Sequence, residues 1–276
     1  MVFSQKELYT TQDLLSIMEL LRSACPWDKQ QTHKSIRKNL IEETYEVAAA
    51  IDSEDCAQLK EELGDLLLQV VFHAQMEKEC GNFNFADVCD ALCKKLIARH
   101  PHVFGGKEAK NAEQALQSWD EIKKNEKQDK TAKGAIESVP RCFPALMRSQ
   151  KVQGRAAKSG FDYPEVGMAM SDLRSEIDEL EQALCAGEAA GLEEELGDLI
   201  FSVVNVSRFV GVDCEEALTK SCDKFIARFE KVESLARERD IDMQKADIKT
   251  LNGLWTEAKE QSKKTEVVKH DKGRTY

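Results

Sequence analysis

One short acidic stretch occurs twice in the chain, and this duplication constrains the fold more than any other feature. The tetrapeptide Glu-Leu-Gly-Asp stands at residues 62–65 and again at 195–198, and both copies lead into a strongly apolar run. Each copy has an acidic pair upstream, namely Glu43 with Glu46 in the first half and Glu176 with Glu179 in the second. In both halves, 19 residues separate the first glutamate of the pair from the glutamate of the tetrapeptide. The repeated spacing of four carboxylates predicts two related units with the same site.

Apolar residues recur with helical spacing along most of the chain. Leu14, Met18 and Leu21, for example, share one face of a helix that we expect over residues 10–24. The apolar runs after the two acidic stretches would tolerate β-structure by composition. They lie inside longer patterns with a 3.6-residue period, however, and this length favours buried helix. We therefore predict an all-α protein made of two tandem, related helical bundles.

A polar stretch of small residues near the middle of the chain separates the two halves. The length of 276 residues is enough for two domains of ordinary size. We place an N-terminal domain at residues 1–128, a linker at 129–140 and a C-terminal domain at 141–262. The last segment, 263–276, is polar and net basic, and this composition predicts a disordered tail.

Composition limits the partners that the protein can have. The net charge of −11 disfavours nucleic acids and anionic membranes. The nine cysteines include no Cys-x-x-Cys pair, which predicts buried, reduced thiols in a cytoplasmic protein. The N-terminus lacks the apolar segment of a signal peptide, and no apolar run approaches the roughly 20 residues that span a bilayer.

The spacing of the carboxylates predicts a metal site in each half. Residues three apart on a helix share a face, with Cβ atoms about 5–6 Å apart. Two adjacent antiparallel helices would therefore bring all four carboxylates of one half together. Two unit charges 5 Å apart repel by about 3 kcal/mol at an effective dielectric constant of 20. An all-oxygen cluster of this kind suits Mg²⁺ or Mn²⁺.

Two other interpretations of the acidic residues are open to the sequence. A solvated acidic face with i,i+4 ion pairs is one, but the duplicated spacing disfavours it. A di-iron carboxylate bundle is the other, but it uses Glu-x-x-His, which neither repeat contains. Gly64 and Gly197 add to the metal-site hypothesis, because glycine inside a helix costs about 1 kcal/mol against alanine. Their recurrence suggests close helix packing or room for a ligand beside the metal.

Cations and an aromatic residue follow each acidic set. A lysine and an arginine four residues apart share a helix face and would bind polyphosphate oxygens, although ion pairs with the acidic helices are the alternative. Further on, a tryptophan precedes a lysine by four residues and would stack on a base, although a core position is the alternative. These residues are Lys95, Arg99, Trp119 and Lys123 in the first half and Lys224, Arg228, Trp255 and Lys259 in the second. The combination is typical of a nucleotide phosphate site, and no P-loop sequence is present.

Together these motifs resemble the MazG-type nucleoside triphosphate pyrophosphohydrolases with tandem domains. The resemblance rests on both acidic sets and on the segments 25–28, 42–46, 99–104, 144–146 and 160–162. It implies a four-helix-type fold, a homodimer, and Mg²⁺-dependent hydrolysis of NTPs and dNTPs to NMP and pyrophosphate. The alternative is a nucleotide-sensing or partner-binding helical module in which one or both copies are catalytically silent.

The resemblance also implies roles for individual residues, and it assigns hydrolysis mainly to the C-terminal copy. Its metal ligands would be Glu176, Glu179, Glu195 and Asp198, with Lys224 and Arg228 completing the catalytic set. The substrate would contact Glu194, Lys224, Arg228, Trp255 and Lys259. The N-terminal copy is a second candidate site, with Glu43, Glu46, Glu62, Asp65, Lys95, Arg99, Trp119 and Lys123. One position departs from the family pattern: the first glutamate of the motif is present as Glu42 but is replaced by Ser175 in the second copy.

Overall fold

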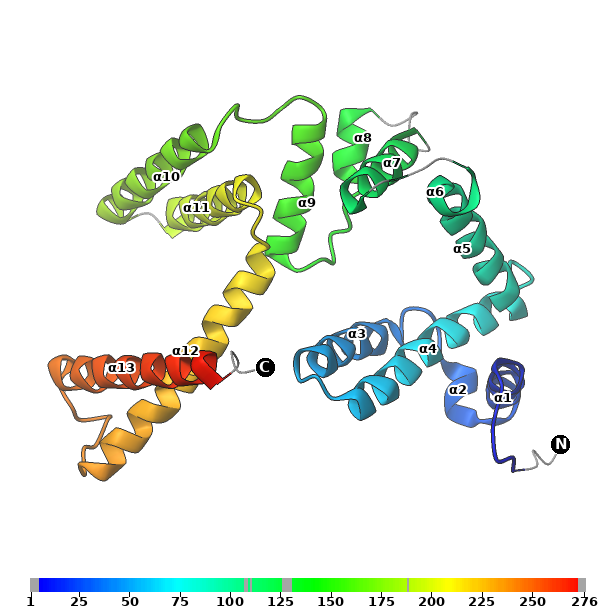
Figure 1. Cartoon of the computed structure of the whole chain (residues 1–276), viewed down its shortest axis with the longest axis horizontal. Helices are drawn as coiled ribbons and strands as arrows, with labels where there is room; N and C mark the ends of the chain where they lie inside the picture. Colours follow the sequence, from blue (N-terminus) through cyan, green and yellow to red (C-terminus); the bar gives the residue numbers. More distant parts are fainter. Residues whose placement is uncertain (1–4, 107–108, 110, 126–130, 188, 273–276) are drawn as a thin grey trace. The chain divides into compact units, whose positions relative to one another are not determined.

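The chain is helical throughout the part that the structure describes. A computed structural model describes residues 5–106, 109, 111–125, 131–187 and 189–272, without the side chains of 117, 120, 121, 123–125, 189, 190 and 263–272. Every regular element in these ranges is an α-helix (Figure 1), which confirms the all-α prediction. None of the described helices combines the length and the apolar character needed to cross a membrane. The chain divides into two units, Met1–Gln128 and Asp129–Tyr276.

The first unit is organised around one long helix, α4. Its helices are α1 (Thr11–Ala24), α2 (Pro26–Gln30), α3 (Arg37–Asp52), α4 (Cys56–Glu79), α5 (Phe85–Arg99), α6 (Pro101–Phe104) and α7 (Ala112–Asn125). Helices α1, α3 and α5 all pack on α4, and α5 also contacts α6 and α7. The α3–α4 pair carries the acidic residues of the first half.

The second unit repeats the pairing of two helices that carry acidic residues. Its helices are α8 (Ala132–Glu137), α9 (Ala145–Lys158), α10 (Val166–Ala186), α11 (Ala189–Phe209), α12 (Cys214–Glu238) and α13 (Ile248–Lys272). Helix α10 packs on α11, and α9 contacts α8, α11 and α12. Helix α12 packs on α13 as well. The α10–α11 pair therefore corresponds to α3–α4.

Two segments differ from the expected domain plan. Helix α8 lies inside the segment 129–140, which we expected to be a linker, and it packs on α9 of the second unit. Helix α13 continues to Lys272, beyond the expected end of the domain at residue 262. The boundary between the two units, after Gln128, coincides with the predicted end of the first domain.

Local sequence signals set the ends of the helices that carry and support the acidic residues. At the start of α1, the Thr10 side chain accepts a hydrogen bond from the Asp13 backbone, and the Asp13 carboxylate accepts one from the Thr10 backbone. Asp55 caps α4 by accepting hydrogen bonds from the backbone N–H groups of two residues in its first turn. Such caps satisfy donors that the helix itself leaves unpaired. Helix α10 ends at Gly187, whose φ of +72° favours glycine.

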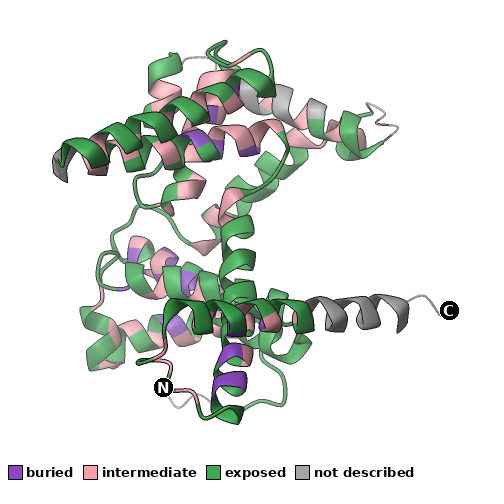
Figure 2. Ribbon diagram, turned by 90° about the vertical axis from the view of Figure 1, so that its left-hand side faces the viewer, coloured by how far each residue is buried: buried purple, intermediate pink, exposed green. Residues whose placement is uncertain are grey.

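Buried residues form two main clusters, one in each unit. The first joins α1 to α4 and consists of Met18, Ile36, Val71, Phe72 and Met76. The second joins α12 to α13 and consists of Val232, Leu235, Ala236, Leu254 and Ala258. Figure 2 shows that buried residues occupy short bands, whereas much of the helical surface is exposed. Many of the exposed residues are large and apolar, including Ile200 and Val203 on α11 and Phe225 and Ile226 on α12.

The prediction of buried cysteines is wrong. All nine cysteines are free thiols, and none of them is buried. Cys25 and Cys214 are half-buried, and the other seven are exposed. Cysteine is common in protein cores because it behaves as a small apolar residue, but here seven cysteines lie on exposed helix faces, helix ends or turns.

Candidate active site

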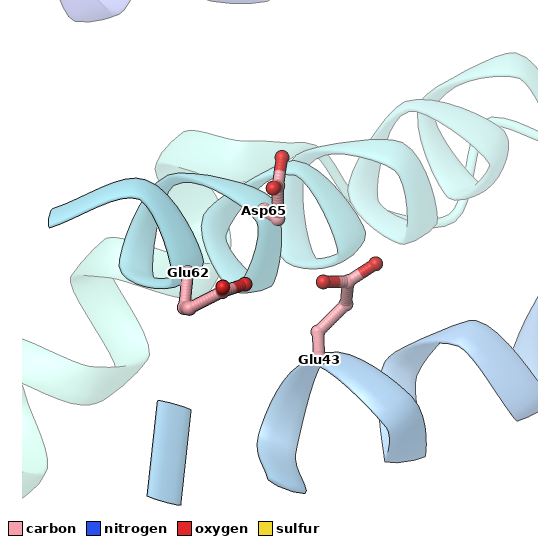
Figure 3. A group of neighbouring side chains, drawn as sticks. All are labelled: Glu43, Glu62 and Asp65. Atoms are coloured by element: carbon pink, nitrogen blue, oxygen red, sulfur yellow. The ribbon is translucent and has the colours of Figure 1, made fainter. Parts of the chain in front are cut away.

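The acidic residues of the first half converge where α3 packs on α4. Glu43 extends from α3 toward α4, and Glu62 and Asp65 project from α4 (Figure 3). One carboxylate oxygen of each lies within 4.8 Å of the others. Glu46, one turn after Glu43, raises the pKa of Glu43 by its negative charge. The structure thus brings the four carboxylates of the first half into one electrostatic group.

The second half repeats this arrangement where α10 packs on α11. One oxygen each from Glu176, Glu179 and Glu195 lies within 4.8 Å of the other two. Asp198, one turn after Glu195, raises the pKa of Glu176 and of Glu195 through its charge. We call these four residues the C-terminal cluster, and Glu43, Glu46, Glu62 and Asp65 the N-terminal cluster. Each cluster contains a set of oxygens that a divalent cation favours.

Within each cluster, the carboxylates repel one another. Burial, followed by the neighbouring carboxylates, raises the pKa of Glu176, and the same is true of Glu195 and Glu43. Among the described residues, the charges that shift these three pKa values are all those of carboxylates. A bound cation would offset this repulsion, and the residues present therefore fit a metal site.

Ser175, the residue that departs from the family motif, has a clear structural role. Its hydroxyl donates a hydrogen bond to Glu179, with 2.9 Å between Oγ and Oε1. A hydrogen bond of this kind orients a carboxylate. Ser175 therefore supports one of the predicted ligands of the C-terminal cluster, although it replaces a glutamate.

A cavity opens beside the C-terminal cluster. It has a volume of about 520 Å³ and is lined by residues of α8, α9, α10, α11 and the segment that joins α9 to α10. Glu176 and Asp198 of the cluster form part of its wall. Val152, Phe161 and Phe201 supply apolar surface to the rest of the wall. A ligand in this cavity would lie next to the predicted metal site.

Several polar residues at this cavity were not predicted from the sequence. Asp172 accepts a hydrogen bond from the Ser202 hydroxyl at 3.2 Å. Burial raises the pKa of Tyr163, and a hydrogen bond to Asp172 raises it further. Asp172 lies one helical turn before Glu176, so its spacing was a usable signal. Gln153 also lines the cavity, but a single glutamine on a helix gives no sequence signal.

The predicted cations do not meet the carboxylates within the described chain. Lys224 is exposed and Arg228 half-buried on α12, a helix that packs on α9 and α13. Within the described residues, neither forms an ion pair with the C-terminal cluster. Lys95 is exposed on α5, and the Arg99 guanidinium lies 5.6 Å from the centre of the Trp119 ring.

The second predicted aromatic–lysine pair lies away from the cavity. Trp255 is half-buried against the α12–α13 core, with its ring centre 5.1 Å from that of Phe225. It is not among the residues that line the cavity. Lys259 is exposed one turn later on α13. Lys123 belongs to α7, but its side chain lies outside the described part of the structure.

The two helical glycines do not mediate close packing within the described chain. A Cβ atom added at Gly64 or at Gly197 would meet no other atom within 4 Å. The suggestion of close helix packing is therefore wrong for contacts inside the chain. Open space beside the acidic residues is the part of the interpretation that agrees with the structure.

Comparison with known proteins places both clusters in one family. Residues 31–104 and 167–233 match the MazG nucleotide pyrophosphohydrolase domain. The chain is 45% identical over 253 residues to the nucleoside triphosphate pyrophosphohydrolase of Escherichia coli (strain K12), which covers 90% of this chain and 96% of the relative. It is 44% identical over 250 residues to the nucleoside triphosphate pyrophosphohydrolase/pyrophosphatase MazG of Thermotoga maritima, with 90% and 95% coverage. The crystal structure of a mazG-related protein from Thermotoga maritima is similar over 41% of this chain and 98% of that protein, with 28% identity and a TM-score of 0.37.

Each acidic cluster lies inside one of the two matched segments, because 31–104 contains the N-terminal cluster and 167–233 contains the C-terminal cluster. The tandem arrangement and the enzyme class predicted from the sequence are thereby confirmed. The chain belongs to the MazG nucleotide pyrophosphohydrolase family.

Proposed function

We propose that the protein is a Mg²⁺-dependent nucleoside triphosphate pyrophosphohydrolase whose C-terminal cluster is the main hydrolytic site. One observation carries the assignment to this cluster: Glu176 and Asp198 line a cavity of about 520 Å³ large enough for a nucleotide. The relatives named as nucleoside triphosphate pyrophosphohydrolases support nucleoside triphosphates as substrates. We propose that both NTPs and dNTPs are hydrolysed, to NMP and pyrophosphate. Mn²⁺ is a second candidate for the metal, since it prefers the same oxygen ligands.

The residues of the C-terminal cluster would hold the metal and the attacking water. Glu176, Glu179 and Glu195 would bind the ion, and Asp198 completes the set from α11. When bound, Mg²⁺ supplies Lewis-acid polarisation of the phosphate oxygens. A carboxylate oxygen of the cluster that does not bind the metal would accept a hydrogen bond from the water that attacks the α-phosphorus. Glu194 precedes Glu195 on α11 and remains a predicted substrate contact.

Lys224 and Arg228 are the proposed ligands of the pyrophosphate leaving group. They lie one turn apart on α12, so both can face the same phosphate chain. Arg228 is half-buried, and its Nε is buried with no hydrogen-bond partner in the described part of the structure. A phosphate oxygen would satisfy such a donor. Trp255 and Lys259 on α13 remain predicted substrate contacts.

We also propose a homodimer. Ile200 and Val203 on α11 are each 45% exposed, and Phe225 and Ile226 on α12 are 55% and 56% exposed. Exposed apolar residues in this number mark a surface that another protein covers. A second copy of the chain would cover such faces on α11 and α12. The molecular mass of the protein in solution tests whether it is a dimer. A cytoplasmic location stays a prediction from the cysteine pattern and the N-terminal sequence, and the absence of nucleic-acid and membrane partners stays a prediction from the net charge of −11.

Product analysis tests the proposed reaction directly. The full chain is incubated with ATP and Mg²⁺, and the products are separated by ion-exchange chromatography. We expect AMP and pyrophosphate in equal amounts, and no turnover when the metal is chelated. ADP with orthophosphate would show that a different bond is cleaved. Nucleotide binding without turnover would instead favour the alternative of a nucleotide-sensing module.

A further inference from the structure

The cavity beside the C-terminal cluster is built to hold more than a phosphate chain. Its volume of about 520 Å³ falls within the range of roughly 300–1,000 Å³ that is typical of small-molecule sites. Phe161 and Phe201 contribute flat apolar surface to its wall, while Glu176 and Asp198 mark the side where the phosphates would lie. A planar, apolar-faced group with polar edges therefore suits the rest of the cavity.

Gln153 is the unusual polar residue of this wall. It is 5% exposed, and its Nε2 donates a hydrogen bond of 2.8 Å to the backbone oxygen of Phe201. A backbone oxygen can only accept, so this contact determines which end of the amide is the nitrogen. The remaining oxygen, Oε1, is buried and has no hydrogen-bond partner in the described part of the structure. An unsatisfied buried acceptor is costly, and a ligand that donates to it recovers this cost.

Asn205 offers the opposite polarity at the same cavity. Its Oδ1 accepts a hydrogen bond of 2.9 Å from Arg208, whose guanidinium is held by Asp162 at 2.6 Å. The oxygen of the Asn205 amide is thereby engaged, and its NH₂ group is the end suited to a ligand. Two residues that line the cavity therefore carry one unpaired acceptor, on Gln153, and one amide donor, on Asn205. The polar edge of a nucleobase carries the complementary donor and acceptor pair.

We propose that this cavity holds the nucleobase of the substrate and that Gln153 Oε1 accepts a hydrogen bond from an N–H group of the base. Gln153 is then a specificity-determining residue that favours bases with an N–H donor over analogues without one. The inference rests on the proposed function, since it assumes that the triphosphate of the same molecule lies at the C-terminal cluster. It assigns base recognition to α9 and α11, away from Trp255.

A comparison of two substrates tests the inference on the unmodified protein. ATP carries a 6-amino group, whereas purine riboside triphosphate has the same ring and phosphates but no N–H donor on its base. We expect kcat/KM for ATP to exceed that for the analogue by roughly 3- to 10-fold, the effect of one hydrogen bond. Equal values would overturn the inference. Absence of pyrophosphate from both substrates would instead contradict the proposed function.

A substitution assigns the preference to Gln153. Gln153→Met keeps the length of the side chain but removes both amide groups, so it also loses the contact with Phe201. Loss of that contact alone would lower kcat/KM for both substrates equally. We expect the ratio between ATP and the analogue to fall to about 1 in the variant, while its melting temperature confirms folding. An unchanged ratio would show that Gln153 does not recognise the base.

The first unit offers a matched control. Gln69 on α4 is 7% exposed, and its Oε1 is also buried without a partner among the described residues. Gln69→Met makes the same chemical change at a buried glutamine outside the cavity. We expect it to leave the ratio between the two substrates at the wild-type value. A ratio that falls equally in both variants would contradict a specific role of Gln153.

Discussion

The two halves of the molecule contain the same acidic residues but surround them differently. In both, two packed helices bring carboxylates together, with three oxygens within 4.8 Å of one another. Ten residues after the glutamate of the tetrapeptide, however, the first half has Phe72 and the second has Asn205. Phe72 is 5% exposed and belongs to the α1–α4 core, whereas Asn205 lines the cavity.

A second difference lies on the other helix of each pair. Four residues before the first glutamate of the acidic set, the first half has Asn39 and the second has Asp172. Asp172 lines the cavity and raises the pKa of Glu176 and of Tyr163. The comparison teaches that a duplicated acidic cluster does not imply duplicated surroundings, because the acidic residues and the residues around them vary independently.

The largest expected effect separates the two clusters. Glu176→Gln should lower kcat with ATP by about 100-fold or more, because it removes a charge that stabilises the reacting centre. Glu43→Gln makes the same change in the N-terminal cluster and should leave kcat within about 3-fold of the wild type, a difference of less than about 1 kcal/mol. The rate of pyrophosphate release gives kcat for both variants. If Glu43→Gln abolishes turnover and Glu176→Gln does not, the assignment to the C-terminal cluster is wrong.

A reciprocal exchange tests the difference between core and cavity. Asn205→Phe places a large apolar side chain at the cavity and should lower kcat/KM with ATP by about 10-fold or more, equivalent to about 1.4 kcal/mol. Phe72→Asn should instead lower the free energy of unfolding of the first unit by about 3–5 kcal/mol. Steady-state kinetics and thermal denaturation distinguish the two outcomes. Full activity of Asn205→Phe would show that the substrate does not use the cavity.

Removal of the Ser175 hydroxyl should have a smaller effect, on the affinity for Mg²⁺. Ser175→Ala removes the hydrogen bond to Glu179, so we expect the Mg²⁺ concentration for half-maximal activity to rise about 10-fold. Glu42→Ala at the corresponding position of the first half is the matched control and should not change it. A Mg²⁺ titration of initial rates measures both variants. No change in Ser175→Ala would mean that the hydroxyl does not orient the ligand.

The smallest effect concerns stability and pH. The pKa values of Glu176, Glu195 and Glu43 are raised above 4.5, so the folded protein binds protons more tightly than the unfolded chain. The contribution of these three groups to the free energy of unfolding without metal should therefore fall as pH rises through and above 4.5. Mg²⁺ at neutral pH should raise the melting temperature by a few degrees, because it binds the folded state. Glu176→Gln should reduce both the pH dependence of the free energy of unfolding and the rise of the melting temperature with Mg²⁺.

A metal-free protein whose melting temperature did not respond to millimolar Mg²⁺ would count against a metal site in either cluster. Glu43→Gln and Glu176→Gln, assayed separately by calorimetry, would show which unit responds. Equal losses in the two variants would indicate that both clusters bind the metal, and the kinetic comparison would then decide which cluster hydrolyses the substrate.

The sequence alone determined the helices and the acidic clusters, because both follow from local patterns. The separation between Glu195 and Asp198 places both side chains on one face because a helix has 3.6 residues per turn. Caps such as Asp55 and the apolar period likewise act over a few residues, so α1, at Thr11–Ala24, agrees with the helix expected over residues 10–24. Given the 19-residue separation in both halves, the carboxylates come together as soon as two consecutive helices pack against each other.

Only the tertiary structure decided which residues surround the C-terminal cluster. Gln153 meets Phe201, 48 residues away, because α9 packs on α11, and no local period encodes that contact. The same packing leaves a cavity beside Glu176, and Asn205 lines it. Phe72, which stands on α4 at the position that corresponds to Asn205, belongs to the α1–α4 core instead. Packing between helices depends on the shapes of many side chains at once. The sequence therefore determined the acidic clusters, and the packing of α9, α10 and α11 determined the cavity beside one of them.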